Sequence, residues 1–75
     1  MDLLDLVVND PDICHGQATI RGTRIPVTVI LDNIAAGLSE SEIIDHYQSL
    51  TPDGIRAAAA YGALLAREDV LPLRS

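Results

Sequence analysis

The chain has 75 residues and a formal net charge of −6, and its only cations are five arginines. A chain of this length makes one small domain, and its 48% of hydrophobic residues favours a folded chain over a disordered one. A single cysteine, Cys14, excludes an intramolecular disulfide and a four-thiolate zinc site. The negative charge disfavours non-specific binding to nucleic acid and suits a basic protein partner.

The chain shows no targeting or membrane signal. Residues Met1–Asp5 lack the positive region and the apolar run of a secretory signal peptide. The uncharged stretch Ala57–Ala66 is far shorter than the roughly 20 residues that span a bilayer. We therefore expect a cytoplasmic protein that does not cross a membrane.

Residues 1–26 form a predicted extended arm that is rich in turns. Leu3–Val8 is an apolar, extended segment, and Asn9–Asp12 is a strong turn signal. Ala18–Ile20 and Arg24–Ile25 are typical of short strands. Such short strands are marginally stable alone. We expect them to pair with the same segments of a second copy, or to pack across the helices, so that a dimer completes the fold.

The remainder of the chain is predicted to be helical. Apolar residues at helical spacing predict a helix over Val27–Ala36. Ser39 and Glu42 form a capping-box pattern for a second helix over Glu40–Tyr47. Thr51 and the proline after it open a third helix over Pro52–Glu68. The predicted fold is one mainly α domain over residues 1–75, with a tri-helical unit over 27–69 and a tail over 70–75.

The sequence offers no convergent catalytic or metal-binding set. Cys14 and His15 are adjacent in an extended segment, so their side chains point to opposite faces and do not form a ready nucleophile–base pair. Asp10 and Asp12 flank a proline and are better explained by a turn than by a metal site. His46 is interpreted as a solvated residue. We expect no enzymatic activity, no metal and no cofactor.

Helix two, a short turn and helix three have the spacing of a helix-turn-helix over residues 41–60. Asp45 and Ser49 depart from that pattern, where a small residue and a glycine are usual. Thr51 and Arg56 are the candidate DNA-binding residues of the recognition helix. Arg56 also begins a helical stripe that could contact a groove or a partner, or could be an ordinary exposed face: Arg56, Ala60, Ala63 and Arg67.

Arg21 and Arg24 are the other candidate DNA-binding residues, and they bracket a Gly-Thr turn. They could contact DNA phosphates as part of a dimer arm. They could equally pair with acids of the same chain such as Asp10 and Asp12, and we favour this structural interpretation.

The run of motifs resembles the bacterial domain-of-unknown-function family number four hundred and thirty-three (DUF433). The resemblance rests on Asp10–Gly16, Ile20–Val27, Ala36–Ser39, Leu50–Thr51 and Ile55–Ala58. It implies a homeodomain-like tri-helical fold and a VapB-type antitoxin encoded beside a PIN-like ribonuclease toxin, and it carries over no catalytic residue. Gln48 stands where the family commonly has proline, which predicts a slightly longer second helix. His15 stands where the family often has glycine or asparagine.

We therefore predict an antitoxin-like binding module that neutralises a PIN-like nuclease toxin as a homodimer, with binding to operator DNA as a second role. The candidate partner-binding residues are in the last turn and the tail: Arg67, Glu68, Asp69, Val70, Leu71 and Leu73. The alternative is a stand-alone dimeric DNA-binding transcriptional regulator. A structural dimer without either role is a further possibility.

Overall fold

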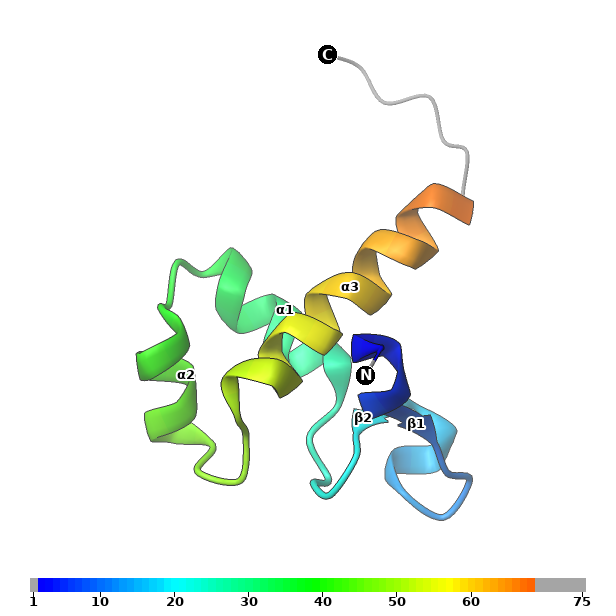
Figure 1. Ribbon diagram of the computed structural model, residues 1–75. Helices are drawn as coiled ribbons and strands as arrows, with labels where there is room; N and C mark the ends of the chain where they lie inside the picture. The colour runs from blue at the N-terminus through cyan, green and yellow to red at the C-terminus, as the bar shows by residue number, and fades with distance from the viewer. Residues whose placement is uncertain (1, 69–75) are drawn as a thin grey trace.

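The computed structural model describes residues 2–68, apart from the side chains of Cys14 and Glu68. In this range the chain is small and mainly helical, with three α-helices and a two-stranded antiparallel sheet (Figure 1). The elements in order are η1 (Leu3–Leu6), β1 (Val7–Asn9), η2 (Cys14–Gly16), β2 (Ala18–Ile20), α1 (Val27–Ala35), α2 (Glu40–His46) and α3 (Pro52–Glu68). The prediction of a helical unit that follows short N-terminal strands is confirmed at this level.

The two strands pair with each other within one chain. Val8 lies opposite Thr19 in the antiparallel ladder, and the Arg21 N–H extends it by donating to the Leu6 carbonyl at 2.7 Å. The strands also pack against α1 and α3, so the second of the two predicted alternatives, packing across the helices, is confirmed, and the ladder itself is formed within the chain. The turn after Asn9 and the short helix η2 bring the chain back on itself, so the sheet closes locally.

The N-terminal segment is also different from the prediction. Leu3–Leu6 forms a 3-10 helix rather than an extended strand, because the Asp2 carboxylate accepts a hydrogen bond from the Leu4 N–H at 3.1 Å. The Val7 N–H donates to the Leu4 carbonyl and ends the turn. This helix, η1, packs against α3.

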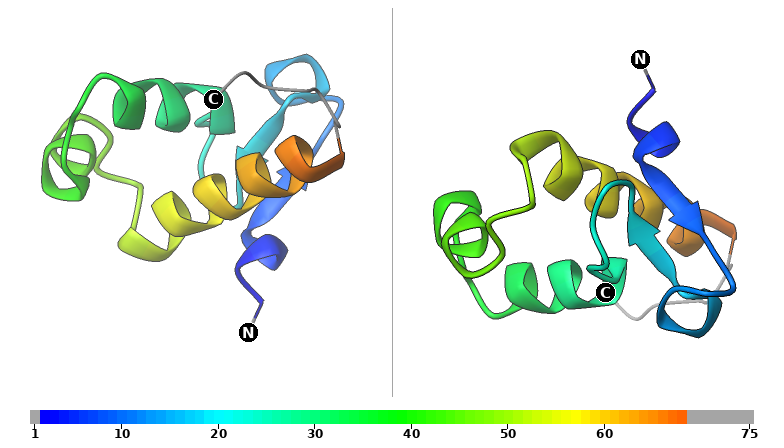
Figure 2. Two further views of the ribbon diagram at one scale, coloured as in Figure 1. Left: turned by 90° about the horizontal axis from the view of Figure 1, so that it is seen from above. Right: turned by 90° about the horizontal axis from the view of Figure 1, so that it is seen from below.

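The core is built from branched aliphatic and alanine side chains around α3. The two further views in Figure 2 show α1 and the hairpin on different sides of this long helix. The α1–α3 contact is close at Gly62, where a Cβ atom would lie 3.1 Å from Leu31 Cδ1. The buried hydrophobic residues come from the three α-helices, from β2 and from the turn before α3: Ile20, Val27, Ile30, Ile43, Leu50, Ile55, Ala57 and Ala58.

The helix boundaries follow their capping residues. The third helix has the predicted bounds, whereas α1 and α2 each end one residue earlier than expected. At α2 the capping box is formed: the Glu42 N–H donates to Ser39 Oγ at 3.2 Å, and the Ser39 N–H donates to Glu42 Oε1 at 3.0 Å. Tyr47 leaves the helical conformation with φ −131°, so Gln48 does not lengthen the helix.

One buried hydroxyl provides a test of the core. Thr19 is fully buried in β2, and its Oγ1 has no hydrogen-bond partner among the described residues. Burying an unsatisfied hydroxyl costs about 1–3 kcal/mol. We expect Thr19→Val to raise the free energy of unfolding by about 1 kcal/mol, measured by urea unfolding followed by circular dichroism.

Thr23→Val is the matched control, because this hydroxyl is fully used. Thr23 Oγ1 donates to the Ile20 carbonyl at 2.7 Å and accepts from the Ile25 N–H at 3.1 Å. Its loss should destabilise the fold by about 1 kcal/mol. A destabilised Thr19→Val would contradict the assignment, since it would mean that the Thr19 hydroxyl has a partner in solution.

The capping box predicts a dependence of stability on pH. The hydrogen bond from the Ser39 backbone, then the one with its side chain, lowers the pKa of Glu42 below 4.5, with a smaller contribution from His46. A carboxylate whose folded pKa is lowered stabilises the fold above its unfolded pKa, and this stabilisation is lost as pH falls through the folded pKa. The difference in melting temperature between the wild type and Glu42→Gln should therefore be present at pH 7 and should shrink below pH about 4.5.

Asp45→Asn is the control for this measurement, because it removes one negative charge from the same helix without touching the capping box. A Glu42→Gln variant as stable as the wild type at pH 7, or one whose deficit persists at pH 3, would rule out a contribution of the Glu42 charge to the capping box, since glutamine can accept the same hydrogen bond.

Candidate interaction surface

The solvent face of α2 is acidic. Glu40, Glu42 and Asp45 are all exposed on this seven-residue helix, and its one fully buried side chain, Ile43, faces the core. Glu40 and Glu42 lie in the first turn, where negative charge interacts favourably with the helix dipole. We call Glu40, Glu42 and Asp45 the acidic face of α2.

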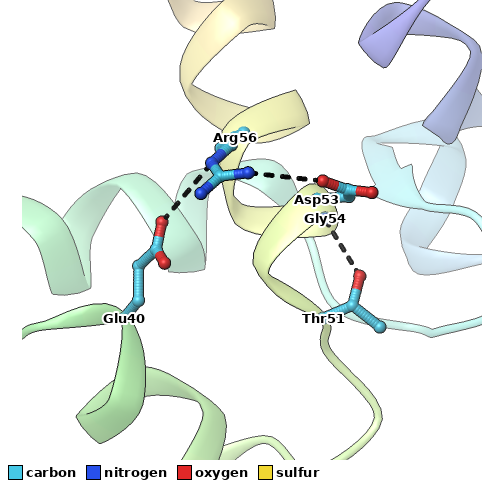
Figure 3. Close-up of polar contacts among 5 residues, drawn as sticks. All are labelled: Glu40, Thr51, Asp53, Gly54 and Arg56. Atoms are coloured by element: carbon cyan, nitrogen blue, oxygen red, sulfur yellow. Dashed lines mark hydrogen bonds and ion pairs between the residues drawn. The ribbon is translucent and has the colours of Figure 1, made fainter. Parts of the chain in front are cut away.

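Arg56, the candidate DNA-binding cation of the third helix, lies between two carboxylates (Figure 3). Its Nη1 is 3.6 Å from Asp53 Oδ1 one turn earlier, and its Nε is 3.9 Å from Glu40 Oε2 on α2. All three side chains are largely exposed, so each ion pair contributes little to stability. The pairs do change the local field, because two negative charges lie beside the positive charge of Arg56.

Thr51 acts as a helix cap. Its Oγ1 accepts a hydrogen bond from the Gly54 N–H at 3.1 Å, which satisfies one of the free donors at the start of α3 (Figure 3). Gly54 is buried, and a Cβ atom there would lie 3.2 Å from Ile20 Cγ2. The structure thus brings Thr51 and Arg56 together on the first turns of α3, and it gives the Thr51 hydroxyl a structural partner.

Arg21 also has a structural partner, although not the predicted one. Its Nε and Nη2 donate to the backbone carbonyl of Asp5 at 3.2 and 2.9 Å, rather than to Asp10 or Asp12. This fork ties the end of β2 to η1. Gly22 follows with φ +81°, a conformation that favours glycine, and turns the chain toward Arg24, which is exposed. The sequence analysis identified the arginine. It could not predict that the acceptor is a backbone carbonyl sixteen residues earlier in the chain.

Only part of the predicted partner-binding set lies in the described range. Arg67 is exposed in the last turn of α3, and Glu68 is the last residue of that helix. Asp69, Val70, Leu71 and Leu73 lie outside the described residues.

The two histidines considered for catalysis lie on different elements, His15 in η2 and His46 at the end of α2. His15 is exposed and takes a left-handed backbone conformation with φ +57°, the conformation that glycine and asparagine adopt readily. His46 is exposed at the end of α2. Among residues 2–68 no three His, Cys, Asp or Glu side chains are placed to hold a metal ion, and this part of the chain forms no pocket.

The acidic face of α2 is the feature that the sequence analysis did not single out. Its signal is the set of three acids in one short predicted helix that contains no arginine.

No helix in the described part of the chain is both long and apolar enough to cross a membrane.

A family model and a solved structure name the same family. The family model described as "Protein of unknown function (DUF433)" matches residues 7–62. The uncharacterized protein y4eO of Sinorhizobium fredii is 37% identical over 57 residues, which are 76% of this chain and 26% of that protein. This chain therefore spans about a quarter of the length of the curated relative that it matches.

A solved structure has the same fold. The crystal structure of a DUF433 member protein from Anabaena variabilis matches with a TM-score of 0.75 and 32% sequence identity. The match covers 84% of this chain and 62% of the other chain. The family model covers more than half of the residues, including the hairpin and most of α3, and so the chain belongs to the DUF433 family.

Proposed function

We propose that this chain is a protein-binding module of the antitoxin type, and that the acidic face of α2 contacts a basic partner. The observation that carries the proposal is the position of the charges. Glu40, Glu42 and Asp45 are all exposed, and Arg56, the cation beside Glu40, is also paired with Asp53. A surface of this kind attracts a protein that carries a positive patch, and it repels the phosphates of nucleic acid.

The proposed partner is a PIN-like ribonuclease toxin encoded beside this protein, as the resemblance to the VapB-type antitoxins implies. A ribonuclease binds a polyanion and therefore presents positive charge around its active site. An acidic module that covers this charge competes with RNA and neutralises the toxin. A homodimer that also binds its operator extends this proposal. Residues beyond Arg67 stay candidate contacts from the sequence alone.

A stand-alone DNA-binding regulator is the second candidate. The succession of α2, a short turn and α3 favours it, because a helix-turn-helix uses this arrangement. The charges favour it less, since Arg56 is paired with two acids and Arg21 donates to a backbone carbonyl. Binding to a promoter duplex that weakens steeply as salt rises would support this candidate.

The antitoxin proposal predicts a complex that a single charge reversal weakens. Co-expression with the product of the adjacent gene should give a stable complex and relieve the toxicity of that product. Asp45→Arg should raise the dissociation constant about tenfold, measured by calorimetry with the purified partner. Asp32→Arg is the matched control, because Asp32 is exposed on α1, away from the acidic face.

No complex and no relief of toxicity would contradict the proposal. An equal loss of affinity in Asp45→Arg and Asp32→Arg would contradict the assignment of the acidic face, because only the total charge of the chain would then matter.

A further inference from the structure

One face of α3 is exposed although the helix forms the centre of the fold. We call it the outer face of α3. Apart from the adjacent pair Ala63 and Leu64, its residues follow one another at intervals of three or four, so they lie on one side of the helix. Five of its six members are exposed and Ala60 is half-buried. The members are Asp53, Arg56, Ala60, Ala63, Leu64 and Arg67.

The middle of this face, from Ala60 to Leu64, is apolar. Residues 57–66 carry no charge, and in Figure 1 the last turns of α3 extend away from the other elements. Leu64 on this face is 36% exposed. The other two large hydrophobic residues exposed within residues 2–68 are Leu65, 45% exposed on another side of α3, and Ile34 on α1. Exposed apolar side chains at this end of α3 are a candidate contact surface.

The charges on the outer face indicate what covers it. Asp53 stands at one end of the face and Arg67 stands fourteen residues later at the other, with Ala60 midway between them in the sequence. Two copies of α3 that pack antiparallel with Ala60 opposite Ala60 therefore place Asp53 of each copy beside Arg67 of the other. The twofold symmetry makes this ion pair twice.

The residues at the centre of that contact permit close packing of the two helices. Ala60 and Ala63 are small and let two helices approach. In this register Arg56 lies opposite Leu64 of the other copy, where the apolar stem of the arginine can cover the leucine. Asp53 is 58% exposed beside Arg56, so its carboxylate has room for a second guanidinium.

Self-association elsewhere on the molecule is less favourable, because the chain carries a net charge of −6. Contacts through α2 would bring Glu40, Glu42 and Asp45 against the same acids of a second copy. The outer face has one acid and two arginines and is free of this repulsion. We propose that two copies of this chain form a symmetric dimer through an antiparallel contact between the outer faces of their α3 helices. This proposal does not rest on the proposed partner of α2.

The test is the oligomeric state of the full chain, measured by sedimentation equilibrium from about 1 µM to 1 mM with the wild type and the variants below. The wild type should show a monomer–dimer equilibrium. Leu64→Glu should raise the dissociation constant at least tenfold. Ile34→Glu is the matched control, because Ile34 is 40% exposed but lies on α1, and this variant should dimerise like the wild type.

A charge exchange tests the antiparallel register. Asp53→Arg and Arg67→Asp should each weaken the dimer about tenfold, since each places like charges together at both ends of the contact. The double variant restores opposite charges and should recover most of the wild-type affinity. Circular dichroism of each variant shows that it is folded, and if Asp53→Arg is not, Arg67→Asp and Leu64→Glu still test the proposal.

A wild-type chain that stays monomeric at 1 mM would overturn the proposal. It would also be overturned by a dimer that tolerates Leu64→Glu, or that is lost in Ile34→Glu, because either result moves the contact to another surface. A dimer that the double charge exchange fails to restore would overturn the antiparallel register.

Discussion

The close packing of α3 against the rest of the chain is the constraint on which this fold depends. A protein without phenylalanine or tryptophan has few large side chains with which to fill a core. It therefore brings backbones together at small residues, with Ala57 and Ala58 fully buried and Gly62 against Leu31. Elements from the first half of the chain, η1, the hairpin and α1, then reach the same helix. A larger side chain at these α3 positions would have to displace one of them.

The contacts that hold the N-terminal third of the chain in place follow from this constraint. A 3-10 helix of four residues and two strands of three residues cannot bury enough surface to be stable alone. They are held because Ile20 enters the core and because the Arg21 guanidinium donates twice to the Asp5 carbonyl. Arg21 therefore has a clear structural role whatever else it contacts.

Local signals in the sequence predicted the helical part of the fold well, and long-range contacts limited the rest. Thr51 with Pro52, and Ser39 with Glu42, are caps whose partners lie within three residues, so the helix starts could be read directly. The pairing of Val8 with Thr19 depends on the path of the intervening turn, which composition does not reveal. The partner of Arg21 is a backbone carbonyl, and every residue has one. For the candidate site, the sequence identified Arg56 but not the carboxylates beside it, because the contact with Glu40 joins two helices.

The distribution of charge suits the two proposed surfaces to different partners. The acidic face of α2 repels nucleic acid and another copy of itself, whereas the outer face of α3 is nearly neutral and suits self-association. The most direct test of the acidic face is an NMR titration of the isotope-labelled chain with the product of the adjacent gene and, separately, with its own promoter duplex. The binding proposal predicts that the protein partner shifts the amide signals of α2, around Glu40 and Asp45. Shifts caused by the duplex alone, centred on Thr51 and Arg56, would contradict it.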